Sequence, residues 1–242
     1  MCSSAASWRV IFIVAALYGA AGLYVLFRHL PETLPPAGRT AFAPGPSLRF
    51  YAAILREPGF LSNALIGAYG MCALFAYLAG SPALFMDEYG DAQWQYSAIL
   101  AGIGIAMIGF YRINSRLVPG AGGARMVTLG IALWAAAGLW LLWLAWSPPR
   151  HATFFIIALL VFSLGYCFIQ SNSPVQARRA HKAHLGAATA LMSTMQYTGG
   201  AVAGALVGRF TDGTARPMAA LVAICAVAAV TAAMLRPIEN RK

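Results

Sequence analysis

Long apolar stretches alternate with short polar, charged or proline-rich segments along the whole chain. A helix that crosses a hydrocarbon core of about 30 Å needs roughly 20 predominantly apolar residues. Seven stretches meet this condition and predict transmembrane helices at residues 10–27, 60–85, 96–111, 126–146, 152–171, 186–208 and 218–235. The pattern therefore predicts an all-α, polytopic membrane protein with seven transmembrane helices.

The composition agrees with this fold class and excludes an ordinary soluble domain. The chain is 60% hydrophobic and 10% charged, whereas soluble domains carry about 45–50% apolar and about 25% charged residues. The net charge of +10 would suggest nucleic-acid binding in a soluble protein. No basic run is interleaved with aromatic side chains as a nucleic-acid groove requires, so we expect loops beside anionic lipid and no nucleic-acid partner.

The basic residues are distributed unevenly over the two sides of the predicted bundle. Of the 17 Lys and Arg residues, 13 fall at alternate helix ends, beginning with the connection after the first predicted helix. Short loops rich in Lys and Arg stay on the cytoplasmic side of a membrane. This distribution predicts an N-terminus outside and a C-terminus in the cytoplasm.

One connection is much longer than the others and divides the chain. Its prolines, from Pro31 to Pro46, exclude a helix over the first half of the connection, whereas residues 47–55 have the pattern of a short helix at the cytoplasmic interface. Long loops between otherwise tightly joined helices mark domain junctions. We therefore expect a lone transmembrane helix at residues 1–28, a cytoplasmic interdomain loop at 29–58 and a six-helix unit at 59–242.

Residues 163–208 predict two helices joined by a basic turn, and both helices carry polar side chains at steps of three or four. These are Ser163, Tyr166, Gln170 and Ser173 in the first helix and Thr189, Ser193 and Gln196 in the second. Residues at such steps share one face of a helix. Because polar faces at membrane depth turn toward protein or a watery cavity, the two helices predict one wall of a cavity.

Candidate substrate-pathway residues follow from the same argument, extended to residues 60–85. They combine amide, hydroxyl, aromatic and methionine side chains, which suit small amphipathic ligands. The candidates are Asn63, Tyr77, Ser81, Tyr166, Gln170, Asn172, Met192, Gln196 and Tyr197. Gly200, Gly204 and Gly208 repeat G-x-x-x-G, which predicts close helix packing. Ordinary packing remains the alternative for each pathway candidate.

Residues that carry catalytic, redox or metal chemistry are not arranged for it in this sequence. The seven acidic residues all lie in predicted loops or at helix ends, so no carboxylate stands at mid-membrane. The four cysteines form no C-x-x-C pair, and neither H-E-x-x-H nor G-x-S-x-G is present. We therefore expect no enzyme, no catalytic residue, no cofactor and no metal site.

Four segments together resemble one family of membrane transporters. They are Trp8-Arg9-Val10-Ile11-Phe12, the run LPETLPP at residues 30–36, Gly80-Ser81-Pro82, and the glycine-rich helix at 184–208. In this order they resemble the C-terminal portion, helices six to twelve, of a major facilitator superfamily transporter of the Bcr/CflA (bicyclomycin/chloramphenicol) multidrug efflux branch. The last six predicted helices then correspond to the C-terminal six-helix bundle of that fold.

The resemblance implies drug/proton antiport across a bacterial inner membrane, with a small amphipathic drug as substrate and membrane lipid as surroundings. It also implies that the first five helices, and with them the proton-coupling acid, are absent. The chain is then a truncated transporter that is not transport-competent alone. Alternatively, it is a half-transporter that needs a separate partner chain, or the product of a fragmentary gene.

Two further alternatives come from the residues themselves. Seven helices with the N-terminus outside also match a receptor or a retinal protein, but residues 218–235 contain no Lys to hold retinal. A membrane-embedded enzyme would have to use Ser163 or Ser193, whose nearest histidines, His181 and His184, lie in the predicted turn.

Overall fold

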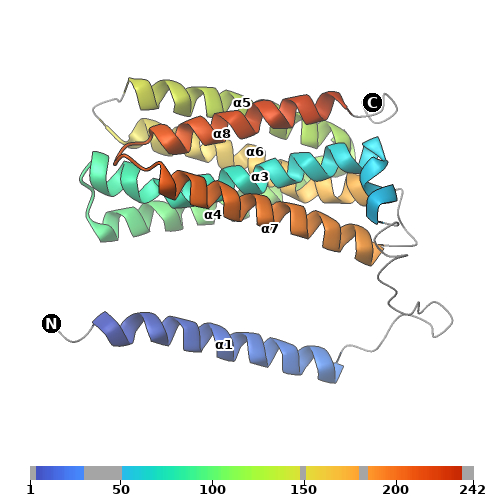
Figure 1. The fold of residues 1–242 in the computed structure, drawn as a ribbon, viewed down its shortest axis with the longest axis horizontal. Coiled ribbons are helices and arrows are strands. Elements are labelled where there is room, and N and C mark those ends of the chain that lie inside the picture. Colours follow the sequence, from blue (N-terminus) through green and yellow to red (C-terminus); the bar gives the residue numbers. More distant parts are fainter. Residues whose placement is uncertain (1–3, 30–50, 148–150, 180–184, 236–242) are drawn as a thin grey trace. The chain divides into compact units, whose positions relative to one another are not determined.

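The computed structural model describes residues 4–29, 51–147, 151–179 and 185–235. Among these residues the regular elements are helices, which confirms the predicted all-α class. The chain divides into two compact units, Met1–Pro44 and Gly45–Lys242, and each is described by itself (Figure 1). Residues 30–50 of the predicted interdomain loop, with the LPETLPP motif, and the histidines of the basic turn lie outside the described residues.

The first unit contains one long helix, α1 (Ser4–His29). Leu17, Tyr18 and Phe27 are among its exposed side chains. A helix that is apolar on all sides needs lipid or a protein partner around it. This is the character expected of the lone transmembrane helix predicted at the start of the chain.

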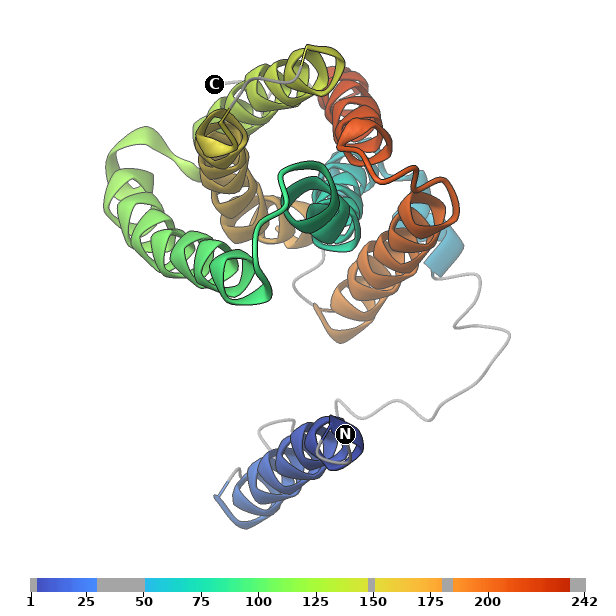
Figure 2. The same ribbon diagram turned by 90° about the vertical axis from the view of Figure 1, so that its left-hand side faces the viewer.

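The second unit begins with a short helix at residues 51–56. It continues with α3 (Pro58–Pro82), η2 (Ala83–Glu88), α4 (Gln93–Ala121), α5 (Gly123–Trp146), α6 (Thr153–Arg178), α7 (Leu185–Arg209) and α8 (Arg216–Met234). Helix α3 contacts α6, α7 and α8, and Figure 2 shows these helices grouped around it. The unit therefore has α3 as its central helix.

Two helix ends differ from the sequence prediction. Helix α4 continues beyond the predicted end at Tyr111 to Ala121, because hydropathy marks only the apolar part of a helix and Arg112 and Arg116 extend it past that part. After Pro82 the chain continues as the π-helix η2. Proline lacks a backbone N–H and crowds the preceding turn, so a wider turn at this point is a local response to Pro82.

The main core lies where α5, α6 and α3 meet. The backbones of α5 and α6 touch, since a Cβ added to Gly165 would stand 2.6 Å from the carbonyl oxygen of Gly130. One turn away, the ring of Phe162 packs edge-on against Trp134 at 6.2 Å and against Tyr77 at 6.4 Å between ring centroids. Glycines at the crossing and aromatic rings beside it thus fix the spacing of the three helices.

Among the described residues, six helical segments are long and apolar enough to cross a membrane. They are Phe12–His29, Pro58–Glu88, Gln93–Ala121, Gly123–Trp146, Thr153–Arg178 and Arg216–Met234. Helix α7 matches them in length with 25 residues, but Ser193, Gln196 and its other polar residues lower its hydropathy. The described helices are those of a multi-pass membrane protein, with six of the seven predicted spans supported by length and composition.

Candidate functional site

Polar side chains from α6 and α7 converge on Gly67 in α3. The Gln170 amide Nε2 in α6 donates a hydrogen bond to the Gly67 carbonyl oxygen at 3.3 Å. The Gln196 amide Nε2 in α7 stands 2.8 Å from the point that a Cβ at Gly67 would occupy. The Tyr166 hydroxyl in α6 contacts the Met71 sulfur at 3.9 Å. We call these five residues, Gly67, Met71, Tyr166, Gln170 and Gln196, the Gly67 cluster.

Helical spacing explains why these side chains meet. Tyr166 and Gln170 are four residues apart and share the face of α6 that packs on α3. Gly70, one turn after Gly67, also has no side chain on this face of α3. A Cβ there would lie 3.6 Å from the Gln170 Nε2. The absence of side chains at Gly67 and Gly70 provides the room that the two amides occupy.

The chemistry of the Gly67 cluster is neutral and hydrogen-bonding. Gln170 and Gln196 are half-buried. Each amide offers two N–H donors and an acceptor oxygen, and the contact with α3 occupies only some of these groups. A tyrosine ring and a thioether stand beside them. Such a set can bind a neutral or weakly polar ligand by a few directed hydrogen bonds and apolar contact.

Tyr77 and Ser81 lie further along α3, inside the core. Tyr77 is 2% exposed, and its hydroxyl is buried without a hydrogen-bond partner among the described residues. The Ser81 hydroxyl lies 2.9 Å from the Tyr96 hydroxyl of α4. These two predicted pathway residues are therefore placed in the interior of the helix packing, toward the η2 end of α3.

Asn63 and Asn172 lie at the opposite end of the unit and form hydrogen bonds between helices. The Asn172 amide donates to the Asn114 side-chain oxygen in α4 at 2.7 Å. The Ser173 hydroxyl donates to the Asn63 carbonyl oxygen, and the Asn63 amide donates to the Gly59 carbonyl oxygen at 2.9 Å. Asn63, Asn114 and Asn172 are all buried. The Asn172 side chain and the Asn63 carbonyl oxygen join helices, whereas the Asn63 side-chain oxygen has no hydrogen-bond partner among the described residues.

The remaining candidates occupy two different environments. Met192 is buried in a second apolar cluster with Ile54 and Phe60, whereas Tyr197 on α7 is 61% exposed. Of the nine predicted pathway residues, the structure thus brings together Tyr166, Gln170 and Gln196 and places the other six elsewhere.

The three glycines of the G-x-x-x-G repeat have different surroundings. A Cβ at Gly200 would lie 3.1 Å from the Phe75 ring, whereas one at Gly204 would be in ordinary contact with Phe75 at 3.9 Å. Gly208 has nothing within 4 Å. Of these three glycines, only Gly200 closely approaches α3 among the described residues.

Sequence reasoning did not select Met71 or Asn114 as site or packing residues. Met71 has the pattern of an ordinary core residue, and only its contact with Tyr166 distinguishes it. Asn114 lay beyond the predicted end of its helix, and its position two residues after Arg112 suggested a loop. A search for buried amides that lie at matching depth on neighbouring helices would have found the Asn114–Asn172 pair.

Charged residues gather where η2 meets the start of α8. The Glu88 carboxylate accepts a hydrogen bond from the Ala215 backbone N–H at 2.8 Å. Burial, with the nearby Glu88 charge, raises the pKa of Tyr89. Within the described membrane-spanning segments, Asp87 and Glu88 at the end of η2 are the only acidic residues, and no three His, Cys, Asp or Glu side chains of the described chain gather as a metal site.

Residues 1–204 match the family model of the Major Facilitator Superfamily. The chain belongs to this superfamily. It is 24% identical over 241 residues to a bicyclomycin resistance protein homolog of Haemophilus influenzae. The aligned region covers 97% of this chain and 59% of that protein. It is also 26% identical over 223 residues to the uncharacterised MFS-type transporter YdgK of Bacillus subtilis. This second aligned region covers 92% of this chain and 55% of that protein.

These matches confirm the resemblance that the four sequence segments indicated. They place this member of the superfamily among transporters rather than enzymes, in agreement with the sequence prediction. The chain spans somewhat more than half the length of the curated relatives it matches.

Proposed function

We propose that this chain is the larger part of a drug-exporting secondary transporter of a bacterial inner membrane, and that the Gly67 cluster forms part of its substrate-cavity wall. The observation that carries the proposal is the convergence of Gln170 and Gln196 on the bare backbone of Gly67. The similarity to a bicyclomycin resistance protein homolog supports a small, neutral, hydrogen-bonding drug as the substrate class. Neutral amides are suited to such a ligand, which needs no countercharge.

The proposed topology has seven spans, with α7 as the fifth of the six spans in the second unit. Helix α7 runs along α3, a predicted span, and has its length. Its polar residues fit a helix that faces a cavity on one side, since such faces are tolerated where they meet protein or water. The distribution of Lys and Arg supports an N-terminus outside and a cytoplasmic C-terminus.

Proton coupling requires an acid that titrates during transport. The described spans hold acids only at the end of η2, and the relatives are considerably longer than this chain. We therefore assign the coupling acid to a further part of the transporter, either on the same polypeptide or on a partner chain. On this view the second unit supplies the drug contacts and the other part supplies the proton step.

The test is a drug-resistance measurement in an efflux-deficient bacterium. The chain is expressed alone and together with the helices that complete its transporter, and growth is measured in bicyclomycin. We expect resistance from the complete transporter and none from the chain alone. In the complete transporter, Gln170→Ala and Gln196→Ala should each lower resistance at least several-fold. The matched control is Gln93→Ala, because Gln93 is exposed at the start of α4.

Two results would reject the proposal. One is equal resistance with all three glutamine variants at equal membrane expression. The other is full resistance from the chain alone, which would place the coupling group within these 242 residues. Cysteine labelling from either side of the membrane at Gly186 and Gly208, near the two ends of α7, tests the seven-span topology separately.

A further inference from the structure

Two thiols from distant parts of the sequence meet inside the second unit. Cys72 in α3 and Cys225 in α8 are free cysteines on two helices that pack together, and their side chains interact. Cys225 is 5% exposed, and Cys72 is half-buried. Neither residue belongs to the Gly67 cluster, and neither is explained by the proposed transport function.

The register of the two helices places these thiols at the same level. A Cβ added to Gly80 would stand 2.6 Å from the Met218 Cβ, so the end of α3 lies against the start of α8 and the helices are antiparallel. Cys72 precedes Gly80 by about 12 Å of helix, and Cys225 follows Met218 by about 10.5 Å. The packing of the two helices thus places Cys72 and Cys225 at the same level.

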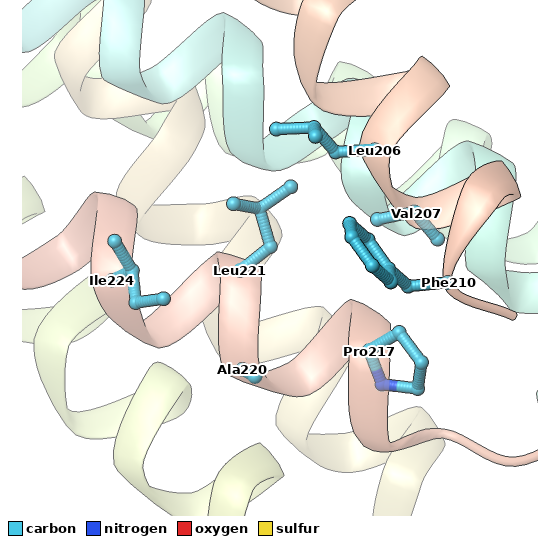
Figure 3. Close-up of a pocket in the computed structure, with 7 residues that line it drawn as sticks. All are labelled: Leu206, Val207, Phe210, Pro217, Ala220, Leu221 and Ile224. Carbon is cyan, nitrogen blue, oxygen red and sulfur yellow. The ribbon is translucent and has the colours of Figure 1, made fainter.

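The neighbouring helix leaves room for the pair. A Cβ at Gly199 in α7 would come within 2.8 Å of the Cys72 sulfur. Toward the α7–α8 loop, α7 and α8 flank an open groove of about 260 Å³ (Figure 3). Leu206 of α7, Phe210 just after it, and Leu221 and Ile224 of α8 line it. Ile224 directly precedes Cys225 in the sequence, so an apolar groove opens within one residue of the buried Cys225.

We propose that Cys72 and Cys225 form a two-coordinate binding site for a thiophilic divalent metal ion, with Hg²⁺ as its probe. Each sulfur loses its proton to water and donates an electron pair to the ion, so two S–H bonds break, two S–metal bonds form and nothing is oxidised. Thiolates select soft metal ions. With only two ligands the site does not satisfy zinc, which requires four.

Charge decides which soft ion the site prefers. A divalent ion with two thiolates forms a neutral complex, whereas Ag⁺ or Cu⁺ with two thiolates leaves one negative charge. Cys225 lies at the middle of α8 and Cys72 near the middle of α3. A net charge at mid-membrane is costly, so the site selects the divalent ion.

The test uses the purified chain in detergent with Cys2→Ser, which keeps Cys72, Cys167 and Cys225. Cys167 is the internal control, because its sulfur contacts the Met107 carbonyl oxygen at 3.9 Å and lies apart from the pair. After Hg²⁺ treatment, a wash with excess monothiol should strip a singly held ion and leave a doubly held one. We expect native mass spectrometry to show one retained Hg²⁺ with the loss of two protons, and a raised melting temperature.

The single variants Cys72→Ser and Cys225→Ser, each also made as Ala, should lose the retained ion at least about 100-fold faster, because they lose the effective concentration of the second thiol. Ag⁺ should be retained at least about tenfold less well than Hg²⁺. Retention unchanged in either single variant, or no retained ion in the parent protein, would overturn the site. Equal retention of Ag⁺ would overturn the selection by charge.

Discussion

The Glu88 carboxylate accepts a hydrogen bond from the backbone N–H of Ala215 at 2.8 Å, although 127 residues separate them. Ala215 is the residue immediately before α8, so a side chain from the end of η2 caps the first turn of the last helix. A carboxylate at this position satisfies an otherwise free N–H and interacts favourably with the positive end of the helix dipole. The contact thus joins the first and last spans of the second unit.

Replacing Glu88 by Ala should lower the stability of the purified protein by about 0.5–2 kcal/mol, the range for loss of a capping side chain. Glu88→Gln should lose less, because its amide oxygen still accepts the hydrogen bond and only the charge is gone. Thermal unfolding in detergent measures both changes. Asp87→Asn is the control, since Asp87 is exposed, and an equal loss in that variant would assign the effect to surface charge.

Glycine-to-alanine changes should have opposite effects at two positions. In Gly165→Ala the new methyl group would meet the Gly130 carbonyl oxygen at 2.6 Å and the Trp134 backbone nitrogen at 2.9 Å. Because neither atom is at the end of a flexible side chain, we expect a loss of about 1–3 kcal/mol. Gly102 in α4 has nothing within 4 Å, so Gly102→Ala should gain about 0.5–1 kcal/mol from helix propensity.

The measurement is the melting temperature of each variant. We expect the wild-type protein to melt above Gly165→Ala and below Gly102→Ala. If Gly165→Ala melted at the wild-type temperature, the α5–α6 backbone contact would be wrong. If Gly102→Ala were the less stable variant, α4 would have to pack against protein at that position.

Gly67→Ala should alter the substrate profile of the complete transporter without unfolding it. The new methyl group would stand 2.8 Å from the Gln196 Nε2, and this amide is the mobile end of a side chain that can swing away. We expect bicyclomycin resistance to change several-fold at normal expression. Gly104→Ala in α4 is the control, because a Cβ at Gly104 would have nothing within 4 Å. Equal profiles in both variants would remove Gly67 from the site.

How much of this architecture is visible in the sequence depends on the range of the interactions involved. The spans are predictable because each depends on about 20 neighbouring residues of similar polarity. The end of α4 at Ala121 and the π-helix after Pro82 are not predictable, since they depend on local backbone strain and on packing partners. Apolar length alone marks neither feature.

The same distinction applies to the candidate site. Tyr166 and Gln170 were predicted to share a face because their spacing is a property of one helix. Gln196 meets them at Gly67 because of the way α7 crosses α3. The spacing of residues within one helix contains no information about that crossing. Asn172 illustrates the limit: its pattern indicates a cavity face, yet the structure pairs it with Asn114 between two helices.

The Asn114–Asn172 pair should respond asymmetrically to truncation. Asn172→Ala leaves the buried Asn114 oxygen without its donor and should cost about 1–3 kcal/mol. Asn114→Ala should cost less, because the Asn172 amide also donates to the Phe168 carbonyl oxygen at 2.8 Å. Thermal melts of the single and double variants form a mutant cycle. An additive double variant would show that the side chains do not interact.

The loop before α8 should respond to acid. Hydrogen bonds from the Thr214 hydroxyl and backbone N–H hold the pKa of the exposed Asp212 carboxyl below its ordinary value. Its contribution is therefore fully present above the ordinary carboxyl pKa of about 3.9, and it is lost as pH falls through the lower folded-state value. The melting temperatures of the wild-type protein and Asp212→Asn should differ at neutral pH and converge in strong acid. A constant difference would contradict this assignment.

The backbone contact between Gly130 and Gly165 has a consequence for movement. Each of these glycines lies against the carbonyl oxygen of the other, with no side chain between the two backbones. Because no rotamer change can loosen such a contact, we expect α5 and α6 to move together as one rigid plate. Helix α7 has a close approach to α3 at Gly200 but open space at Gly208. A conformational cycle in this unit would therefore tilt α7 and bend α3 near Pro82, with the α5–α6 plate as the fixed frame.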